Sequence, residues 1–156
     1  MLLLLVLLFW FLLTAFSPET CPPSGCFQNF CWDLSLIDGH TLHAVCEGEG
    51  EVRENHLDLN LCVGVEGKKL QWEDGGFFAG IAEFTFITNA DQFRDDRRIV
   101  LTGDCPSGRD RGPSFNCKLD LSQKIWIDGG QLGCFDHRAE VHDPYDIRRD
   151  MPGPRD

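Results

Sequence analysis

The sequence contains an internal repeat, and this repeat restricts the possible folds more than any other feature. The stretch LDLNLCVGVEGKKLQW at residues 57–72 is echoed by LDLSQKIWIDGGQLGC at residues 119–134, which places Gly67 on Gly129. Two copies at a spacing of about sixty residues indicate a duplicated module. Because two copies are too few for a solenoid, we predict one closed domain with pseudo-two-fold symmetry.

The first residues have a different character from the rest of the chain. Residues 2–13 form an unbroken apolar run, and the small residues Ala15 and Ser17 follow it. A membrane-spanning helix needs about 20 apolar residues, so this run is too short to span a bilayer and is typical of a secretory signal. No Lys or Arg precedes the run, which leaves a retained short anchor as the alternative. We expect residues 1–17 to be a signal peptide and the protein to be secreted and extracellular.

Composition narrows the compartment and the partners. All eight cysteines follow the apolar segment, and an even number of cysteines in a short secreted chain indicates a disulfide framework. No CxxC pair occurs that would indicate a zinc site. The net charge of −11 lies entirely after residue 17 and repels phosphate backbones and anionic headgroups. We therefore expect no nucleic-acid partner, no membrane partner and no cofactor.

The sequence does not indicate an enzyme. It has no GxSxG, HExxH, P-loop or Gly-rich dinucleotide motif. Carboxylate pairs are common in so acidic a chain, so they do not by themselves indicate a glycosidase. His40 and His43 are three residues apart and would not share a face of a strand, so this pair does not predict a metal site.

A β-hairpin is predicted between Cys31 and Cys46. Two alternating runs flank Asp38-Gly39, and this dipeptide favours a two-residue type I′ turn. Such a turn places Cys31 opposite Cys46, and a disulfide between them closes a loop of about 15 residues, which contributes about 3 kcal/mol in the chain-entropy model. An ideal ladder would make the two cysteines a hydrogen-bonded pair, so we also expect a slight bulge.

Strand patterns continue through both copies, whereas helical periodicity is thin after residue 17, so we predict an all-β domain. Further strands are predicted at residues 57–59, 70–72, 84–87 and 99–101. The expected connections are a polar, acidic segment at residues 47–56, a turn at Glu66-Gly67, a polar loop at residues 88–98 and a Gly/Arg/Pro loop at residues 106–113.

The predicted domain spans residues 18–135, with repeat one at residues 27–74 and repeat two at residues 77–135. Gly75-Gly76 separates the two copies, and a hinge of this kind would permit a domain-swapped dimer. The tail at residues 136–156 mixes Arg and Asp with prolines and has no apolar period. We expect the tail to be disordered.

These motifs together resemble one protein family. The cysteine-bounded hairpin around Asp38-Gly39, the LDLN and LDLS segments, and the turn glycine followed by leucine in each copy are similar to the cyanovirin-N homology domain in its fungal-type form. The resemblance covers the chain from Phe27 to Phe135. It implies a lectin-like protein in which each repeat supplies a three-stranded sheet and a β-hairpin, with strands exchanged between repeats. It also implies a sugar site at each end for mannose-rich glycans, especially terminal α1-2-linked mannose, bound without metal.

The resemblance assigns candidate sugar ligands at both ends. At the first end these are Gln28, Asn29, Phe30, Glu47, Trp126, Ile127 and Asp128. At the second end they are Gly64, Val65, Glu66, residues 75–79, Pro106 and Ser107. Carboxylates accept hydrogen bonds from sugar hydroxyls, which suits Glu47 and Asp128, whereas the second end offers only Glu66 and Ser107 as polar ligands. Trp126 replaces the usual Asn and could stack on a sugar ring, so we favour the first end.

Several of the candidate ligands and neighbouring residues have alternative, structural interpretations. Glu47 would otherwise be a solvated acid, and Asp128 a turn residue whose side chain bonds the backbone. Asp58 and Asp120 recur in both copies, which favours a turn or capping role, and Asn60 is expected to make structural hydrogen bonds. The two tryptophans Trp32 and Trp72 are expected to fill the core.

The second repeat departs from the family's disulfide pattern. The resemblance implies a cysteine pair there, but Ile81 or Ala82 stands where its first cysteine is expected. Cys105 therefore lacks its usual partner. It is left to pair with Cys117, Cys134 or Cys62 or to remain free, and sequence alone does not choose among these connectivities.

The motifs and the resemblance lead to two hypotheses for the function of the protein. The first is a secreted lectin-like protein that binds mannose-containing glycans through Glu47, Asp128 and neighbouring backbone. The alternative is a secreted interaction protein that keeps the scaffold but has lost sugar binding. In that case a protein partner would contact the enlarged loop that contains Arg94, Arg97 and Arg98, which is otherwise a solvated loop.

Overall fold

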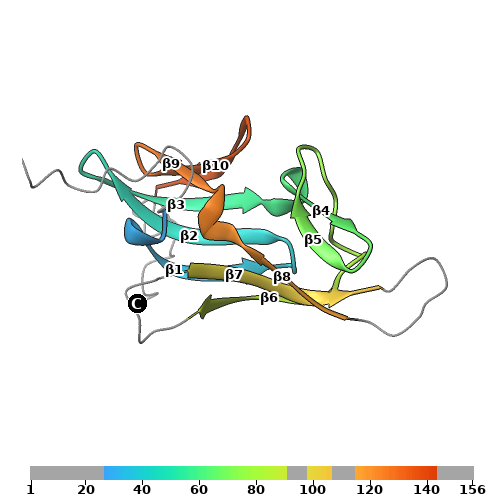
Figure 1. The fold of residues 1–156 in the computed structure, drawn as a ribbon. Coiled ribbons are helices and arrows are strands. Elements are labelled where there is room, and N and C mark those ends of the chain that lie inside the picture. Colours follow the sequence, from blue (N-terminus) through green and yellow to red (C-terminus); the bar gives the residue numbers. More distant parts are fainter. Residues whose placement is uncertain (1–26, 91–97, 107–114, 144–156) are drawn as a thin grey trace, which may run out of the picture.

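The computed structural model describes residues 27–90, 98–106 and 115–143, and these form the strand-rich body in Figure 1. All paired strands within its sheets run antiparallel, which confirms the predicted all-β class. Three short 3₁₀-helices accompany the strands: η1 (Phe27–Asn29), η2 (Leu59–Leu61) and η3 (Leu121–Gln123). Within the described ranges, no helix is long and apolar enough to cross a membrane.

Each repeat contributes a sheet and a hairpin. The first repeat supplies β1 (Cys31–Ile37), β2 (Thr41–Gly48) and β3 (Glu51–Asp58), followed by the hairpin β4 (Val63–Glu66) and β5 (Lys69–Trp72). The second repeat supplies β6 (Glu83–Ala90), β7 (Arg98–Cys105) and β8 (Phe115–Asp120), followed by the hairpin β9 (Trp126–Asp128) and β10 (Gln131–Cys134). Two further strands are β11 (His137–Arg138), which pairs with β10, and β12 (Glu140–His142), which pairs with β3.

The hairpins pack on the opposite repeat. Strand β5 of the first repeat contacts β8 of the second, and strand β10 of the second repeat contacts β3 of the first. Figure 1 accordingly shows the β9–β10 hairpin beside β2 and β3 and the β4–β5 hairpin at the other end of the molecule. This arrangement agrees with the strand exchange that the sequence resemblance implied.

The repeated LDL segments build the same local structure twice. Oδ1 of Asp58 accepts a hydrogen bond from the backbone N–H of Asn60 at 3.0 Å, and Oδ1 of Asp120 accepts one from Ser122 at 2.9 Å. Each aspartate therefore caps the 3₁₀-helix that follows it, which satisfies a backbone donor that the short helix leaves open. The predicted capping role of both aspartates is confirmed.

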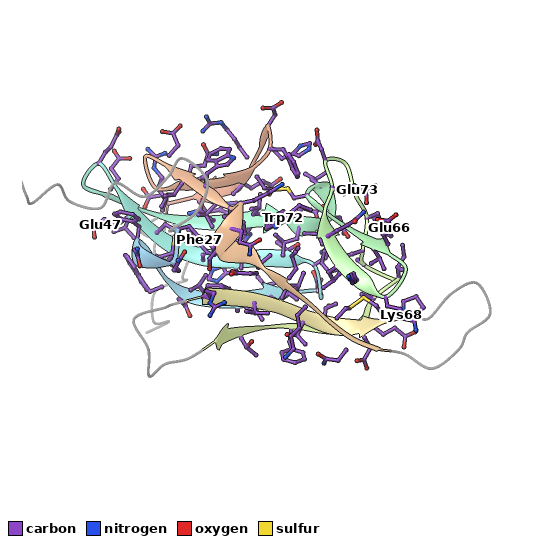
Figure 2. All side chains as sticks on the ribbon, in the orientation of Figure 1. Phe27, Glu47, Glu66, Lys68, Trp72 and Glu73 are labelled. Carbon is purple, nitrogen blue, oxygen red and sulfur yellow. A yellow bond between two sulfur atoms is a disulfide. The ribbon has the colours of Figure 1, made fainter. Side chains whose placement is uncertain are left out.

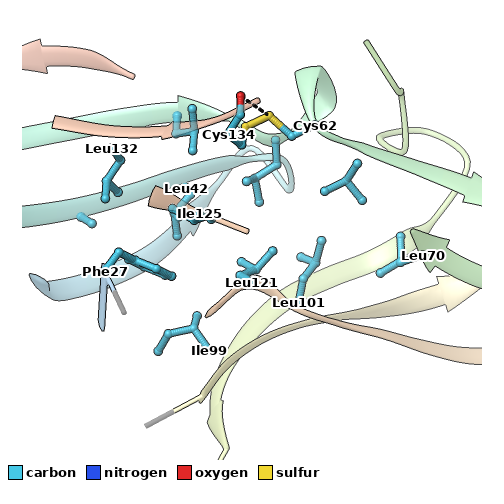
Figure 3. Packing of buried hydrophobic residues seen from close by; sticks show 14 of the residues in the cluster. Phe27, Leu42, Cys62, Leu70, Ile99, Leu101, Leu121, Ile125, Leu132 and Cys134 are labelled. Carbon is cyan, nitrogen blue, oxygen red and sulfur yellow. Dashed lines mark hydrogen bonds between the residues drawn. A yellow bond between two sulfur atoms is a disulfide. The ribbon is translucent and has the colours of Figure 1, made fainter. Parts of the chain in front are cut away.

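The leucines of the repeat form the core. Figure 3 shows side chains from both repeats packed into one cluster between the sheets and hairpins. Its fully buried aliphatic members include Leu42, Leu57, Leu59, Leu101, Leu121, Ile125 and Leu132. Full burial of one such side chain contributes about 1.5–3 kcal/mol, so this shared cluster is the main force that closes the two repeats on each other.

Three disulfides join described cysteines. Cys31–Cys46 connects β1 and β2, where the two residues face each other, and the ladder is bulged between Trp32 and Ser35, as predicted. The predicted two-residue turn is wrong, because Ile37 pairs with Thr41 and the turn contains residues 38–40; the bulge offsets this extra residue and brings Cys31 opposite Cys46. The other two bridges are Cys62–Cys134, which links the repeats, and Cys105–Cys117, which links β7 to β8. Of the partners left open for Cys105, the structure therefore selects Cys117. Cys21 and Cys26 lie outside the described residues.

The predicted connection at residues 47–56 is wrong. Strand β2 continues to Gly48 and β3 begins at Glu51, so only Glu49-Gly50 forms the turn. Both turn residues have positive φ angles, 55° and 80°, as a tight hairpin turn requires. The polar composition was misleading because most of β3 before Leu57 is only partly buried or exposed.

Three other local predictions need correction. The loop predicted at residues 88–98 is shorter, because β6 continues to Ala90 and β7 begins at Arg98. The turn between β4 and β5 lies at Gly67-Lys68, one residue later than predicted, since Glu66 pairs with Lys69. Trp32 does not fill the core but is 47% exposed, because Cys31 points inward and successive residues of a strand point to opposite faces. Trp72, by contrast, packs against the core as predicted.

The tail is not structureless throughout. Residues 137–142 form β11 and β12, so the prediction of disorder from Asp136 onward is wrong for this part. Strand β12 pairs with β3 through the backbone, and such pairing does not need the apolar period that was missing from the sequence. Residues 144–156 lie outside the described residues.

Candidate functional site

The first end of the molecule consists of η1, the β2–β3 turn and the β9–β10 turn, and Figure 2 shows Glu47 there. The backbone N–H of Glu47 donates to the carbonyl oxygen of Phe30 at 3.0 Å, which ties β2 to the segment after η1. A Cβ atom at Gly48 would collide with the backbone of Gly129 and Gly130, so the two turns touch without an intervening side chain. Segments from both repeats therefore build this end together.

A buried amide on β3 holds the two turns in register. Nδ2 of Asn55 donates to the carbonyl oxygen of Gly130 at 2.9 Å, and Oδ1 of Asn55 accepts from the backbone N–H of Leu132 at 2.8 Å. The side chain is completely buried, so the loss of either bond would leave an unsatisfied polar group away from water. Asn55 thus fixes the exchanged β9–β10 hairpin against the first repeat.

Three predicted ligands lie on the joined segments of the first end. Gln28 and Asn29 belong to η1, and Glu47 lies near the end of β2 with its side chain exposed. Oε1 of Gln28 is buried and accepts no hydrogen bond from the described part of the chain. Glu49 was not predicted, although its carboxylate lies beside Gly129. The dipeptide Glu49-Gly50 resembles Asp38-Gly39 and was the signal that could have located this turn.

Trp126 and Asp128, which are also predicted ligands at this end, have different neighbours. Both guanidinium NH groups of Arg138 donate to Oδ2 of Asp128 at 3.2 Å, and the guanidinium lies 5.0 Å from the centre of the Trp126 ring. Trp126 also donates from Nε1 to the carbonyl oxygen of Phe135 at 3.0 Å, and its ring covers Gly133. Trp126 and Asp128 therefore belong to a cluster with Arg138, which the sequence analysis had assigned to the tail.

The second end consists of the β4–β5 hairpin and residues 73–79. Figure 2 shows Glu66, Lys68 and Glu73 here, on the side of the molecule opposite Glu47. The Glu73 carboxylate lies against Gly64, where a Cβ atom would displace it, and the backbone at Gly76 passes directly over Val63 and Gly64. Glu66 is exposed beside the turn, as a solvated acid would be.

Two further residues complete the description of the second end. Oδ1 of Asn60 accepts from the backbone N–H groups of Phe78 at 3.2 Å and Ala79 at 3.0 Å, which confirms its predicted structural role. The indole N–H of Trp72 is buried and has no acceptor within the described ranges. Ser107 lies outside the described residues, so of the two polar ligands predicted for this end only Glu66 is placed.

A shallow hollow of about 410 Å³ lies between the β2–β3 turn and β12. Its lining is formed by Gly50, Glu51, Val52, Arg53, Val141, His142 and Asp143. None of the predicted sugar ligands that the structure describes lines this hollow. Within the described ranges, one group of side chains has ligand atoms close enough to hold a metal ion, namely His43, Glu54 and His56, and none of these is a predicted sugar ligand either.

Comparison with known proteins supports the sequence resemblance. The family model of the CVNH domain matches residues 27–133. The NMR structure of GzCVNH, the CVNH protein of Gibberella zeae, is similar with a TM-score of 0.59 and 31% identity, over 69% of this chain and 95% of that one. A comparison with curated proteins found no match.

Two sugar-bound structures also share the fold. A microvirin:mannobiose complex has a TM-score of 0.58 and 20% identity, over 71% of this chain and 99% of that one. The crystal structure of a MoCVNH3 variant in complex with (N-GlcNAc)4 has a TM-score of 0.58 and 16% identity, over 74% of this chain and 100% of that one. At these identities the two matches establish the fold and leave the ligand of this chain to be argued from its own residues.

Proposed function

Because the chain belongs to the CVNH family, we propose that it is a secreted carbohydrate-binding protein that recognises mannose-containing glycans at its first end without metal. The observation that carries the proposal is the convergence of η1, the β2–β3 turn and the β9–β10 turn around Glu47. The disulfides between described cysteines suit an oxidising, extracellular compartment. Microvirin bound to mannobiose offers a precedent for such a ligand on this fold.

The chemistry of the first end suits sugar hydroxyls. The carboxylates of Glu47 and Glu49 accept hydrogen bonds, and charged acceptors make bonds about twice as strong as neutral ones. Oε1 of Gln28 is buried without a donor in the described part of the chain, so a sugar hydroxyl would reach this acceptor only after the side chain turns outward. Asn29 adds an amide with both donor and acceptor atoms on the exposed side of η1. A mannose ring with adjacent hydroxyls would form hydrogen bonds with the two carboxylates and the Asn29 amide at once.

Trp126 and Asp128 have a secondary role in this proposal. Asp128 is engaged by Arg138, and both side chains are more than half exposed. An exposed ion pair contributes no more than about 1 kcal/mol, so a sugar could displace Arg138 at small cost. Glu47 therefore carries the first-end site, and Asp128 would join it only after this exchange.

The proposal is tested by a glycan array on the full chain, expressed in a secretory host, followed by titration calorimetry with each glycan that binds. We expect α-mannosides among the ligands and a loss of binding in Glu47→Ala. Glu66→Ala is the matched control, since Glu66 is also an exposed carboxylate but lies at the second end. Equal binding by the wild type and Glu47→Ala would contradict the proposed site.

One observation favours the alternative of a scaffold that has lost sugar binding. Asp128 is bonded to Arg138 and the second end offers few polar ligands, so the sugar-binding groups are fewer than the resemblance implied. A protein partner at the Arg-rich loop would then be expected, although residues 91–97 lie outside the described residues. A correctly folded protein that binds no glycan would select this alternative.

A further inference from the structure

Three side chains on adjacent strands bring metal-ligand atoms together on one face of the first-repeat sheet. His43 on β2 lies directly opposite His56 on β3, and Glu54 precedes His56 by two residues and so shares its face. One carboxylate oxygen of Glu54, Oε1, lies 3.1 Å from Nε2 of His43 and 3.2 Å from Nε2 of His56. The ligand atoms of the three residues all lie within 4.8 Å of one another.

The backbone fixes which nitrogen of His43 faces the carboxylate. Nδ1 of His43 lies 3.1 Å from the carbonyl oxygen of Asp33 and 3.4 Å from Oγ of Ser35. Because a carbonyl only accepts and a hydroxyl can accept as well, a hydrogen on Nδ1 suits both contacts. Asp33 lies in the β1 bulge and has a φ of 53°, so the bulge aims this carbonyl at the ring. In metalloproteins, a backbone carbonyl on the second ring nitrogen is the usual means of orienting a histidine ligand.

This tautomer leaves two acceptors facing each other. Neutral His43 presents the lone pair of Nε2 to the carboxylate of Glu54, which also only accepts. Two acceptors 3.1 Å apart require a proton or a metal ion between them. With protons, each histidine would donate its own hydrogen bond to Oε1 of Glu54, whereas a metal ion would bind both histidines and the carboxylate at once.

The spacing suits zinc. Ligand atoms about 2.0–2.1 Å from a tetrahedral zinc ion lie about 3.3 Å from one another, close to the 3.1 Å and 3.2 Å between Glu54 and each histidine. The two histidine nitrogens lie within 4.8 Å of each other, so small rotations of these partly exposed side chains would complete the site. The three side chains are 14%, 18% and 31% exposed, so they are partly shielded but open to solvent ions. His142 on β12 lies beside Glu54 in the ladder, with its ring centre 5.1 Å from that of His56.

We propose that His43, Glu54 and His56 form a zinc-binding site on the outer face of the β2–β3 ladder. The fourth position would be taken by water or, after rotation of its exposed side chain, by His142. Because the ligands come from neighbouring strands, zinc would clamp β2 to β3 close to the place where β12 joins the sheet. The site is independent of the proposed sugar site, which uses none of these residues.

The test is a calorimetric titration with zinc chloride of the full chain, expressed in a secretory host and purified without a histidine tag. We expect one zinc ion per chain. Glu54→Gln and His56→Ala should each weaken binding by at least about 100-fold, the upper end of the loss measured for outer-shell partners of metal sites.

His137→Ala is the matched control, because His137 also contacts a carboxylate and is 32% exposed, against 31% for His56. This variant should bind zinc as the wild type does. In NMR spectra of the unmodified protein, zinc should shift the ring signals of His43 and His56 but leave those of His137 in place, which tests the site even if a variant fails to fold. Absence of zinc binding, or an equal loss in His137→Ala, would overturn the proposal.

Discussion

The two sheets carry different side chains at matching places, Asn55 opposite Ala44 in the first sheet and Cys117 opposite Gly103 in the second. Asn55 extends its amide to the exchanged β9–β10 hairpin, whereas Cys117 is bonded to Cys105 within its own sheet. The same duplicated backbone is therefore stabilised by different interactions in the two repeats. In the first repeat, the hydrogen bonds of Asn55 connect β3 to the hairpin of the other repeat and organise the first end, where the sugar site is proposed.

The largest expected effect comes from the bridge between the repeats. Cys62 and Cys134 are 72 residues apart, against 12 for Cys105 and Cys117, and a longer closed loop gives a larger entropic contribution. Replacing both Cys62 and Cys134 by Ala should lower the free energy of unfolding by about 4 kcal/mol, and the Cys105/Cys117 double variant by about 3 kcal/mol. Denaturant unfolding measures both. A larger loss in the Cys105/Cys117 variant would contradict this ranking.

The second largest effect is expected when the hydrogen bonds of Asn55 in the first repeat are removed. Asn55→Leu should lower the free energy of unfolding by about 3 kcal/mol, because Gly130 and Leu132 would each keep an unsatisfied buried group that costs about 1–3 kcal/mol. Asn116→Leu is the control, since Asn116 lies on β8 with an exposed side chain. Urea unfolding curves of the two variants provide the comparison. A similar stability in both would show that the Asn55 amide does not stabilise the contact between β3 and the β9–β10 hairpin.

A smaller difference is expected between glycines at the two ends. Gly48→Ala would press a methyl group into the rigid backbone of Gly129 and Gly130, which should cost about 2 kcal/mol and weaken sugar binding. The methyl group of Gly64→Ala would first meet the carboxylate end of Glu73, which can move aside, and the nearest atoms all belong to this one side chain, so its effect should be less than about 1 kcal/mol. Thermal unfolding and calorimetry report the two quantities, and equal losses in the two variants would remove the distinction between the ends.

The smallest effect on stability is expected at Arg138. Its exposed ion pair with Asp128 contributes no more than about 1 kcal/mol, so Arg138→Ala should unfold nearly as the wild type does. The same change releases the Asp128 carboxylate and should strengthen binding of any mannoside that the first end recognises. Calorimetric titration of the variant measures this gain, and weaker sugar binding would mean that Arg138 itself contacts the ligand.

The sequence predicted the parts of the fold that depend on local signals or on duplication. Asp58 and Asp120 could be interpreted as caps because both copies repeat them. The turn at Asp38-Gly39 predicted the Cys31–Cys46 pair, although the turn has one more residue than expected and the β1 bulge offsets it. Most of strand β3 was missed, because the polar residues before Leu57 do not alternate with apolar ones. The buried Asn55 satisfies its amide on a hairpin about 75 residues away in the chain.

The candidate site was predictable only in part. Glu47 was placed at the first end by the resemblance. The ion pair that occupies Asp128 could not be predicted in this way, because Arg138 is brought to Asp128 by the pairing of β10 with β11. The cluster of His43 and His56 was missed for a similar reason, since the two histidines come together through the β2–β3 register and not through their spacing in the chain. Contacts that depend on the pairing of separate strands leave little trace in a single sequence.

The central claim is that the first end binds a mannoside, and the most direct test is an NMR titration of the isotope-labelled full chain with mannobiose. We expect the amide signals of Asn29, Glu47 and Gly129 to shift together and saturate as mannobiose is added. The amide signals of Glu66 and Lys68 at the second end should stay in place. Shifts confined to the second end, or no shifts in a folded protein, would contradict this claim.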